Sequence, residues 1–343
     1  MEAPPRWLAC SITLNNGECS LKTLQLSAQA QDLDIAAHLL QQGKLVALPT
    51  ETVYGLAADA TQPEAVSRIF AAKGRPANHP LIVHIGRIEQ LSDWAKDIPP
   101  QAMDLAKACW PGPVTLLLSK ADHVSPVVTG GLNTIAIRMP AHPVMLAILK
   151  QHRLAVAAPS ANPYKQLSPT NAQQVCSGLD GKIDAIVDGG DCLFGLESTI
   201  LDMTSTQPNV LRAGPVTAQE LGKILGTEVH YPQHHNVAVP GNVGSHYQPK
   251  TILRLINDLP QALALADPQA QYAVLHHSKL DAYPHGTHAI TMPDEPVAYG
   301  QCLYRVLAQA DELKPDEIWL ERPPQGEMWN AVNDRLSRAA LPE

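Results

Sequence analysis

Hydrophobic positions along the chain follow two patterns, short apolar runs and longer stretches with an apolar residue every three or four positions. The short runs, rich in Val, Ile, Leu and Ala, predict buried strands. In the first two-thirds we expect strands at residues 45–48, 81–85, 114–119, 134–139, 154–158, 185–188, 198–203 and 209–212. Helical patterns separate some of these strands and others follow each other directly, which predicts an α/β fold with one large mixed sheet flanked by helices.

Three helix starts are marked by capping residues. One helix is expected to start after Ser27 as its N-cap, to carry an apolar stripe, and to end at Gly43. A second helix should open with Pro63 in its first turn, where proline is well tolerated. Thr217 and Glu220 have the spacing of a capping box, so a third helix should begin there.

Changes in composition divide the chain into four segments. Residues 1–22 have weak periodicity and are interpreted as an N-terminal extension, and residues 23–228 form the first α/β domain. Residues 229–250 are rich in Pro, Gly, Asn and His and are expected to be a linker. Residues 251–343 predict a second, smaller Rossmann-like α/β domain, with a helix near 297–310 and strands at 251–256, 272–277, 288–292 and 317–321.

Composition narrows the class of protein. With 45% hydrophobic and 17% charged residues the chain can fold into sizeable cores, and a net charge of -8 argues against a broad electrostatic grip on nucleic acid. The six cysteines form no CxxC pair and HExxH is absent, so we expect reduced thiols and no metal bound by protein side chains. No signal peptide and no membrane-length apolar run are evident, which favours a cytoplasmic protein without membrane contact.

Two segments near the first strands carry candidate chemistry. The sequence LPTETVYGL places residues 50–52 at a strand end, where ligands collect in α/β domains, although an ordinary turn explains the same pattern. Lys73, Arg75 and His79 cluster on a loop stiffened by prolines. Their charges suit a triphosphate, whereas the alternative is a solvated basic turn. No GxxxxGK[ST] motif is present, so the phosphate site is not a P-loop.

A third segment, APSANPYKQLSPT, follows a buried strand. It offers Ser160, Asn162 and Ser168 as small polar groups on a loop fixed by prolines, and turn chemistry alone would also favour these residue types. A serine nucleophile has little support, because no GxSxG motif occurs.

Arg138 and Arg212 are two further candidate binding residues. Arg138 ends an apolar strand, so its charge requires either a ligand carboxylate or an internal Asp or Glu. The segments GLESTILD and LRAGPV add Ser198 and Arg212, a hydroxyl and a further fixed cation.

The order of these motifs is more specific than any one of them. PTETVYGL, KxR, SxN, GLESTI and LRxG together resemble the YrdC-type domain of threonylcarbamoyl-AMP synthases over about residues 25–225. The linker sequence PGNVGSHYQP and the C-terminal EIWLERPPQGEMWNAVNDRLSRAA are similar to the longer, two-domain branch of that family. The resemblance implies a twisted α/β sheet around a large, positively charged cavity.

The resemblance also implies an activity and its residues. Enzymes of this family condense L-threonine, bicarbonate and ATP, which carries Mg²⁺, into threonylcarbamoyl-AMP and pyrophosphate. A separate transferase then modifies the tRNA adenosine beside the anticodon, so tRNA would be an indirect partner. The positions that match the threonine side are Thr52, His84, Arg138, Ala158 and Ser198. Those that match the ATP side are Lys73, Arg75, His79, Thr134, Ser160, Asn162, Ser168, Arg212 and Tyr247, of which Lys73 and Arg75 would stabilise phosphate charge in catalysis.

Two other functions remain as alternatives. A non-catalytic RNA-binding factor would use the same cavity, but the net charge and the 4% aromatic content disfavour it. A carbamoyl-transfer module of hydrogenase maturation would need acylphosphatase and CxxC zinc modules, which the sequence lacks. For the second domain, positioning the linker as a lid and docking the partner transferase are both open.

Overall fold

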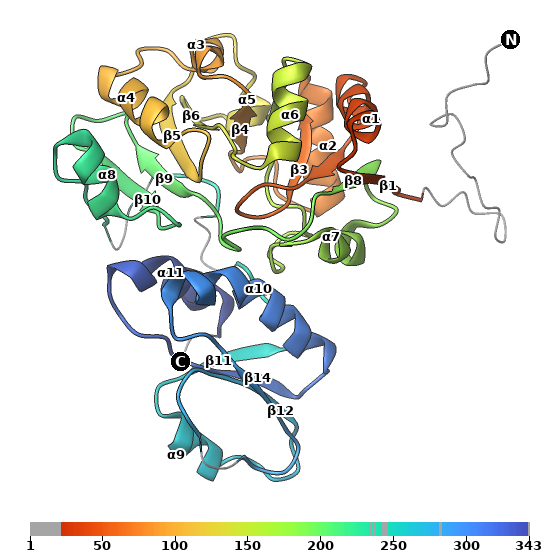
Figure 1. Cartoon of the computed structure of the whole chain (residues 1–343), viewed down its shortest axis with the longest axis vertical. Helices are drawn as coiled ribbons and strands as arrows, with labels where there is room; N and C mark the ends of the chain where they lie inside the picture. The colour runs from red at the N-terminus through yellow and green to blue at the C-terminus, as the bar shows by residue number, and fades with distance from the viewer. Residues whose placement is uncertain (1–21, 233–234, 236, 242–245, 281–282, 342–343) are drawn as a thin grey trace, which may run out of the picture.

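The computed structural model describes residues 22–232, 235, 237–241, 246–280 and 283–341. The expected extension at residues 1–22 therefore lies almost wholly outside the described residues. Figure 1 shows a larger upper body built on one sheet and a smaller lower body built on another.

The first sheet has ten strands in the order β1-β8-β2-β3-β7-β4-β6-β5-β9-β10. The sheet contains both parallel pairs, such as β4 with β6, and antiparallel pairs, such as β4 with β7, so the predicted mixed sheet is confirmed. The strands are β1 (Leu24–Ser27), β2 (Val46–Leu48), β3 (Gly55–Asp59), β4 (Ile82–Ile85), β5 (Val114–Ser119), β6 (Thr134–Arg138), β7 (Ala155–Ala157), β8 (Ala185–Asp188), β9 (Thr199–Asp202) and β10 (Asn209–Arg212).

Helices cover both faces of this sheet, and successive residues of one strand enter different cores. Val46 and Leu48 of β2 pack in one apolar cluster, whereas Leu45 and Ala47 belong to another. Such strands appear in sequence as continuous apolar runs, because neither face meets water. The helices are α1 (Ala30–Gln41), α2 (Pro63–Lys73), α3 (Leu91–Trp94), α4 (Pro100–Cys109), α5 (Pro126–Thr129), α6 (Pro143–Gln151), α7 (Ala172–Leu179) and α8 (Ala218–Leu225), with the 3₁₀ turn η2 (Ile88–Gln90).

The predicted N-cap at Ser27 is wrong, because α1 begins at Ala30 with Gln29 as its N-cap. Ser27 instead ends β1, and both its backbone N–H and its hydroxyl donate to the carboxylate of Asp32, at 2.8 and 2.6 Å. The other capping predictions are confirmed: Pro63 opens α2 and the Thr217–Glu220 capping box opens α8.

The second domain is confirmed as a small Rossmann-like unit. Its four strands are all parallel, in the order β11-β14-β12-β13. The elements are β11 (Ile252–Ile256), α9 (Leu259–Ala264), β12 (Tyr272–His276), β13 (Thr287–Thr291), α10 (Pro296–Glu312), β14 (Glu317–Glu321), η3 (Glu327–Trp329) and α11 (Asn330–Ala339). Figure 1 shows α10 and α11 on the side that faces the first domain. No helix in the described part of the chain has the length and apolarity to span a membrane.

Candidate active site

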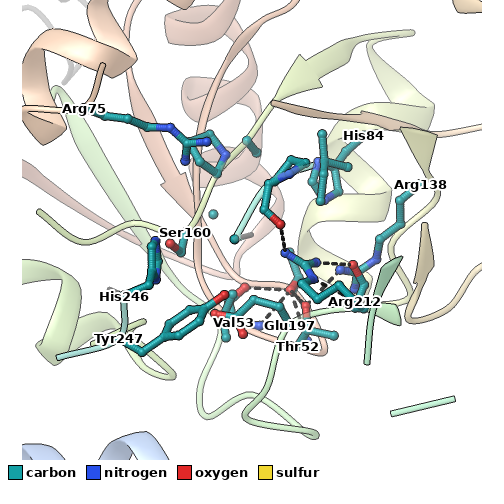
Figure 2. A pocket seen from close by; sticks show the side chains of 18 residues that line it. Thr52, Val53, Arg75, His84, Arg138, Ser160, Glu197, Arg212, His246 and Tyr247 are labelled. Atoms are coloured by element: carbon teal, nitrogen blue, oxygen red, sulfur yellow. Dashed lines mark hydrogen bonds between the residues drawn. The ribbon is translucent and has the colours of Figure 1, made fainter. Parts of the chain in front are cut away.

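One pocket lies where several strands of the large sheet end. Its walls come from the loop after β2, the ends of β4, β6 and β10, the loop after β7, the segment before β9, and the interdomain linker. Figure 2 shows Arg138 and Arg212 close together on one side of this pocket, with His246 and Tyr247 on the other. The lining residues are Thr50, Thr52, Val53, Gly55, Arg75, Ile82, His84, Arg138, Ala158, Pro159, Ser160, Glu197, Ser198, Arg212, Pro240, Gly241, His246 and Tyr247.

Arg138 has an internal partner in the structure. Its Nη2 lies 2.6 Å from Oε1 of Glu51, and both side chains are at most 5% exposed. This contact lacks hydrogen-bond geometry, so the two Glu51 oxygens have only the charge of the guanidinium as compensation. Nη1 and Nε donate to Oγ1 of Thr52 and to the carbonyl of Gly112, at 2.9 and 3.2 Å. Of the two partners that the sequence left open, the internal carboxylate is the one observed.

Arg212 is held entirely by neutral acceptors. Its Nε and Nη2 donate to the carbonyl and hydroxyl of Ser198, both at 3.0 Å, and Nη1 donates to the Pro240 carbonyl at 3.0 Å. A Cβ at Gly241 would lie 3.2 Å from Nη1 of Arg212 and 2.6 Å from the Tyr247 hydroxyl. The positive φ of +83° at Gly241 and this crowding together require glycine there.

The two predicted phosphate-binding cations have different positions. Arg75 lines the pocket, donates to the Pro80 carbonyl at 3.0 Å, and has no hydrogen-bond partner for its Nε. Burial lowers the pKa of Arg75 to about 10, so the guanidinium still carries its charge at neutral pH. The Lys73 amine instead donates to the carbonyls of Ser160 and Asn162 and does not line the pocket. Lys73 therefore fixes the loop that presents Ser160, and its contact with a triphosphate stays a prediction.

His84 is a neutral polar group in the wall. Burial and the adjacent charge of Arg138 lower the pKa of His84 to about 3. Its Nδ1 is buried and has no hydrogen-bond partner in the structure. A neutral imidazole with a free nitrogen suits a hydroxyl-bearing ligand.

The linker closes one side of the pocket. Tyr247 is 1% exposed, adopts a positive φ of 61°, and stacks on Tyr304 of α10 with the ring centroids 5.6 Å apart. The His246 backbone N–H donates to the Arg338 carbonyl of α11 at 3.1 Å. The free space inside the pocket is about 50 Å³, compared with roughly 300–1,000 Å³ for ligand sites in general. A nucleotide therefore requires this wall to move.

The structure brings together all residues matched to the threonine side, and part of the ATP set. From the latter, Arg75, Ser160, Arg212 and Tyr247 line the pocket. The remaining residues, Lys73, His79, Thr134, Asn162 and Ser168, lie outside its lining.

Two buried carboxylates were not assigned from the sequence. The sequence singled out Glu51 only as one of residues 50–52 at a strand end, without a role of its own, and gave Glu197 no role. Both are less than 8% exposed. A charged residue flanked by buried positions was the available signal, because such a charge must find a partner.

Comparisons with known proteins cover both domains. A family model described as "Telomere recombination" matches residues 38–214, and one described as "Threonylcarbamoyl-AMP synthase, C-terminal domain" matches residues 216–341. The chain is 39% identical to the threonylcarbamoyl-AMP synthase of Bacillus subtilis over 336 residues, 93% of this chain and 95% of that protein. It is 48% identical to that of Pyrococcus abyssi over 220 residues, which cover 63% of this chain and 65% of the relative.

The fold comparison agrees. The structure of P. abyssi Sua5 complexed with L-threonine superposes with a TM-score of 0.85 at 36% identity, over 93% of this chain and 97% of that one. These matches define the chain as an enzyme with a YrdC-type domain followed by a dedicated C-terminal domain. More narrowly, the chain belongs to the threonylcarbamoyl-AMP synthase family, in its two-domain branch, as the resemblance implied.

Proposed function

We propose that this enzyme condenses L-threonine, bicarbonate and ATP into threonylcarbamoyl-AMP and pyrophosphate. The observation that carries the proposal is the single pocket in which Arg138, His84 and Ser198 lie beside Arg75 and Arg212. It offers a cation for a carboxylate, a neutral partner for a hydroxyl, and two further cations for phosphates. Family membership and the relatives' names support the same reaction.

The chemistry requires positioning and charge stabilisation more than a strong base. The threonine amine adds to the carbon of bicarbonate, and water leaves. An oxygen of the resulting carbamate then attacks the α-phosphorus of ATP, and the bond to pyrophosphate breaks. Arg138 would hold the amino-acid carboxylate, which fixes the amine in place. Arg75 and Arg212 would stabilise the negative charge that develops on phosphate oxygens.

Magnesium would arrive with the nucleotide and not from a protein site. No group of three or more His, Cys, Asp or Glu residues with metal-binding geometry occurs in the described ranges. The ion would neutralise phosphate charge and orient the leaving pyrophosphate. The product would pass to a separate tRNA-modifying transferase in the cytoplasm, with tRNA as an indirect partner.

Pyrophosphate release tests the proposal. Purified protein with ATP, Mg²⁺ and bicarbonate is assayed with L-threonine, with L-serine and without an amino acid. Threonine-dependent release, with much less for serine, is expected. Release that does not depend on the amino acid, or no release, would contradict the proposal, and salt-dependent RNA binding would then be measured for the non-catalytic alternative.

A further inference from the structure

Among the described residues that line the pocket, Glu197 is the only one with an acidic side chain. The proposed reaction assigns no role to it. It directly precedes Ser198, whose carbonyl and hydroxyl hold Arg212. A carboxylate in a pocket that must bind a triphosphate would ordinarily repel the ligand, so its surroundings need a physical explanation.

Most of the groups that bind Glu197 come from the second domain. Arg335 of α11 is fully buried and donates from Nε to Oε2 of Glu197 at 2.8 Å. The Tyr304 hydroxyl of α10 donates to the same oxygen at 3.1 Å, and the Ser168 hydroxyl donates to Oε1 at 2.6 Å. Arg335 is further anchored on the first domain by a 2.9 Å hydrogen bond from Nη1 to the Ala213 carbonyl. The arginine therefore lies in a fixed position between the two domains.

Without Arg335, the next cation available to Glu197 would be Arg212. Burial raises the pKa of Glu197, but the charges of Arg335 and then of Arg212 more than offset this and hold it at about 2. Glu197 is thus ionised at neutral pH, and its negative charge already interacts with the positive charge of Arg212. Since Arg212 is bonded only to neutral acceptors, its charge is not used by an ion pair within the described residues.

We propose that Arg335 is a positioning residue for the nucleotide: by binding Glu197 from the second domain, it prevents that carboxylate from neutralising Arg212. The positive charge of Arg212 is then kept for the phosphates of ATP. This inference rests on the proposed function, which makes ATP the ligand. Arg335 and Tyr304 of the second domain also hold the linker. The Arg335 guanidinium lies 5.5 Å from the centroid of the Tyr247 ring, and this ring stacks on Tyr304.

The test compares four full-length variants: Arg335→Met, Glu197→Gln, the double variant, and Arg305→Ala. Arg305 also reaches from α10 to the first domain, with Nη1 3.9 Å from Asp191, but it is 48% exposed and far weaker as an ion pair. It is therefore the matched control for the loss of an interdomain arginine. The readouts are calorimetric binding of Mg·ATP, and KM and kcat for pyrophosphate release.

Arg335→Met should weaken Mg·ATP binding by about tenfold or more, the scale of one charge-assisted phosphate contact. The added Glu197→Gln should restore binding to within about threefold, because an amide has no charge to neutralise Arg212. Arg305→Ala should bind as the wild type does. A merely structural role of Arg335 would not be rescued by the glutamine.

Two results would overturn the proposal: wild-type ATP affinity in Arg335→Met, or a double variant that binds ATP as weakly as the single one. The double variant removes both charges of the Glu197–Arg335 pair, and Asp334, the other carboxylate bonded to Arg335, keeps its pair with Arg338. The double variant therefore decides the question even if Arg335→Met alone fails to fold. Failure of the proposed function is a separate result. A wild type that binds Mg·ATP but releases no threonine-dependent pyrophosphate would refute the reaction and leave the comparison of ATP affinities intact.

Discussion

Replacing Glu51 with glutamine should destabilise the free enzyme and strengthen its grip on L-threonine. In the structure, Oε1 of Glu51 lies 2.6 Å from Nη2 of Arg138. We propose that the threonine carboxylate binds to the same guanidinium. The ligand must therefore share Arg138 with a resident carboxylate. Glutamine removes that competing charge and keeps the size of the side chain.

The magnitude follows from burial. Removing one partner of a buried ion pair costs about 3–5 kcal/mol, because the other charge is left without compensation. We expect the lower end, about 3 kcal/mol, since the pair lacks hydrogen-bond geometry and Arg138 keeps its bonds to Thr52 and Gly112. For domains of this size that corresponds to a melting temperature lower by roughly 6–12 °C. L-threonine affinity should rise about tenfold, which 1.4 kcal/mol provides.

The assay is thermal unfolding by circular dichroism, with and without L-threonine, together with calorimetric titration of the amino acid. Glu317→Gln is the control, because Glu317 pairs with Arg254 at 2.8 Å on the surface of the second domain, where such a pair contributes about 0–1 kcal/mol. A Glu51→Gln variant with an unchanged melting temperature and weaker threonine binding would refute the reasoning. Glu51 would then be a ligand-binding group and not a competitor.

Three further outcomes follow from the site. Gly214→Ala should lower stability by more than about 3 kcal/mol, since its Cβ would lie 2.3 Å from the backbone nitrogen of Thr199; a melting curve like that of the wild type would contradict this. The pKa of His84 is about 3 in the folded protein, compared with about 6.5 in the unfolded chain. The contribution of His84 to stability should therefore be complete above about pH 6.5 and fall by about 2 kcal/mol by pH 5. His246, whose pKa burial also lowers to about 3, adds a loss of the same sign, so the difference between wild type and His84→Gln in urea titrations at both pH values measures the share of His84. Arg75→Ala should cut turnover by roughly 10²–10³ with little change in melting temperature. Lys73→Ala should lower both turnover and melting temperature, because the Lys73 amine holds two loop carbonyls. Similar melting temperatures of the two variants would contradict this distinction.

The strands of the large sheet could largely be predicted, for a physical reason. Both faces of the sheet are covered, so strands such as β5 and β8 consist mainly of consecutive apolar residues, LLL in β5 and AIV in β8. The missed strands lack this signal. β1 is four residues with an alternating, partly exposed pattern, and β3 is GLAAD, whose Gly and Ala residues have weak strand propensity although all five positions are buried. Only the register with β2 and β7 makes β3 a strand.

The pocket could be predicted only in part. Motif order identified Arg138 and Arg212, because strand ends in α/β domains carry ligand-binding groups. It could not identify how these charges are paired. The Glu197–Arg335 contact joins residues 138 positions apart in two different domains, and no local pattern in either segment points to the other. The sequence also placed Lys73 beside Arg75 as an equal, whereas the fold turns the two side chains in different directions.

The hydrogen bonds of the linker favour a lid function for the second domain over a docking surface. One side of the linker is bonded to α11 through the His246 N–H, and the other to the first domain, where the Gln248 N–H donates to the Lys165 carbonyl at 2.8 Å. With only about 50 Å³ of free space, ATP entry must disturb this wall. The second domain holds the wall through the His246 N–H and through the stacking of Tyr247 on Tyr304. The lid function therefore predicts that a chain truncated at residue 228 loses most pyrophosphate release through a higher KM for ATP. Full activity of the truncated chain would eliminate the lid function, and measured binding of the second domain to the partner transferase would then favour docking.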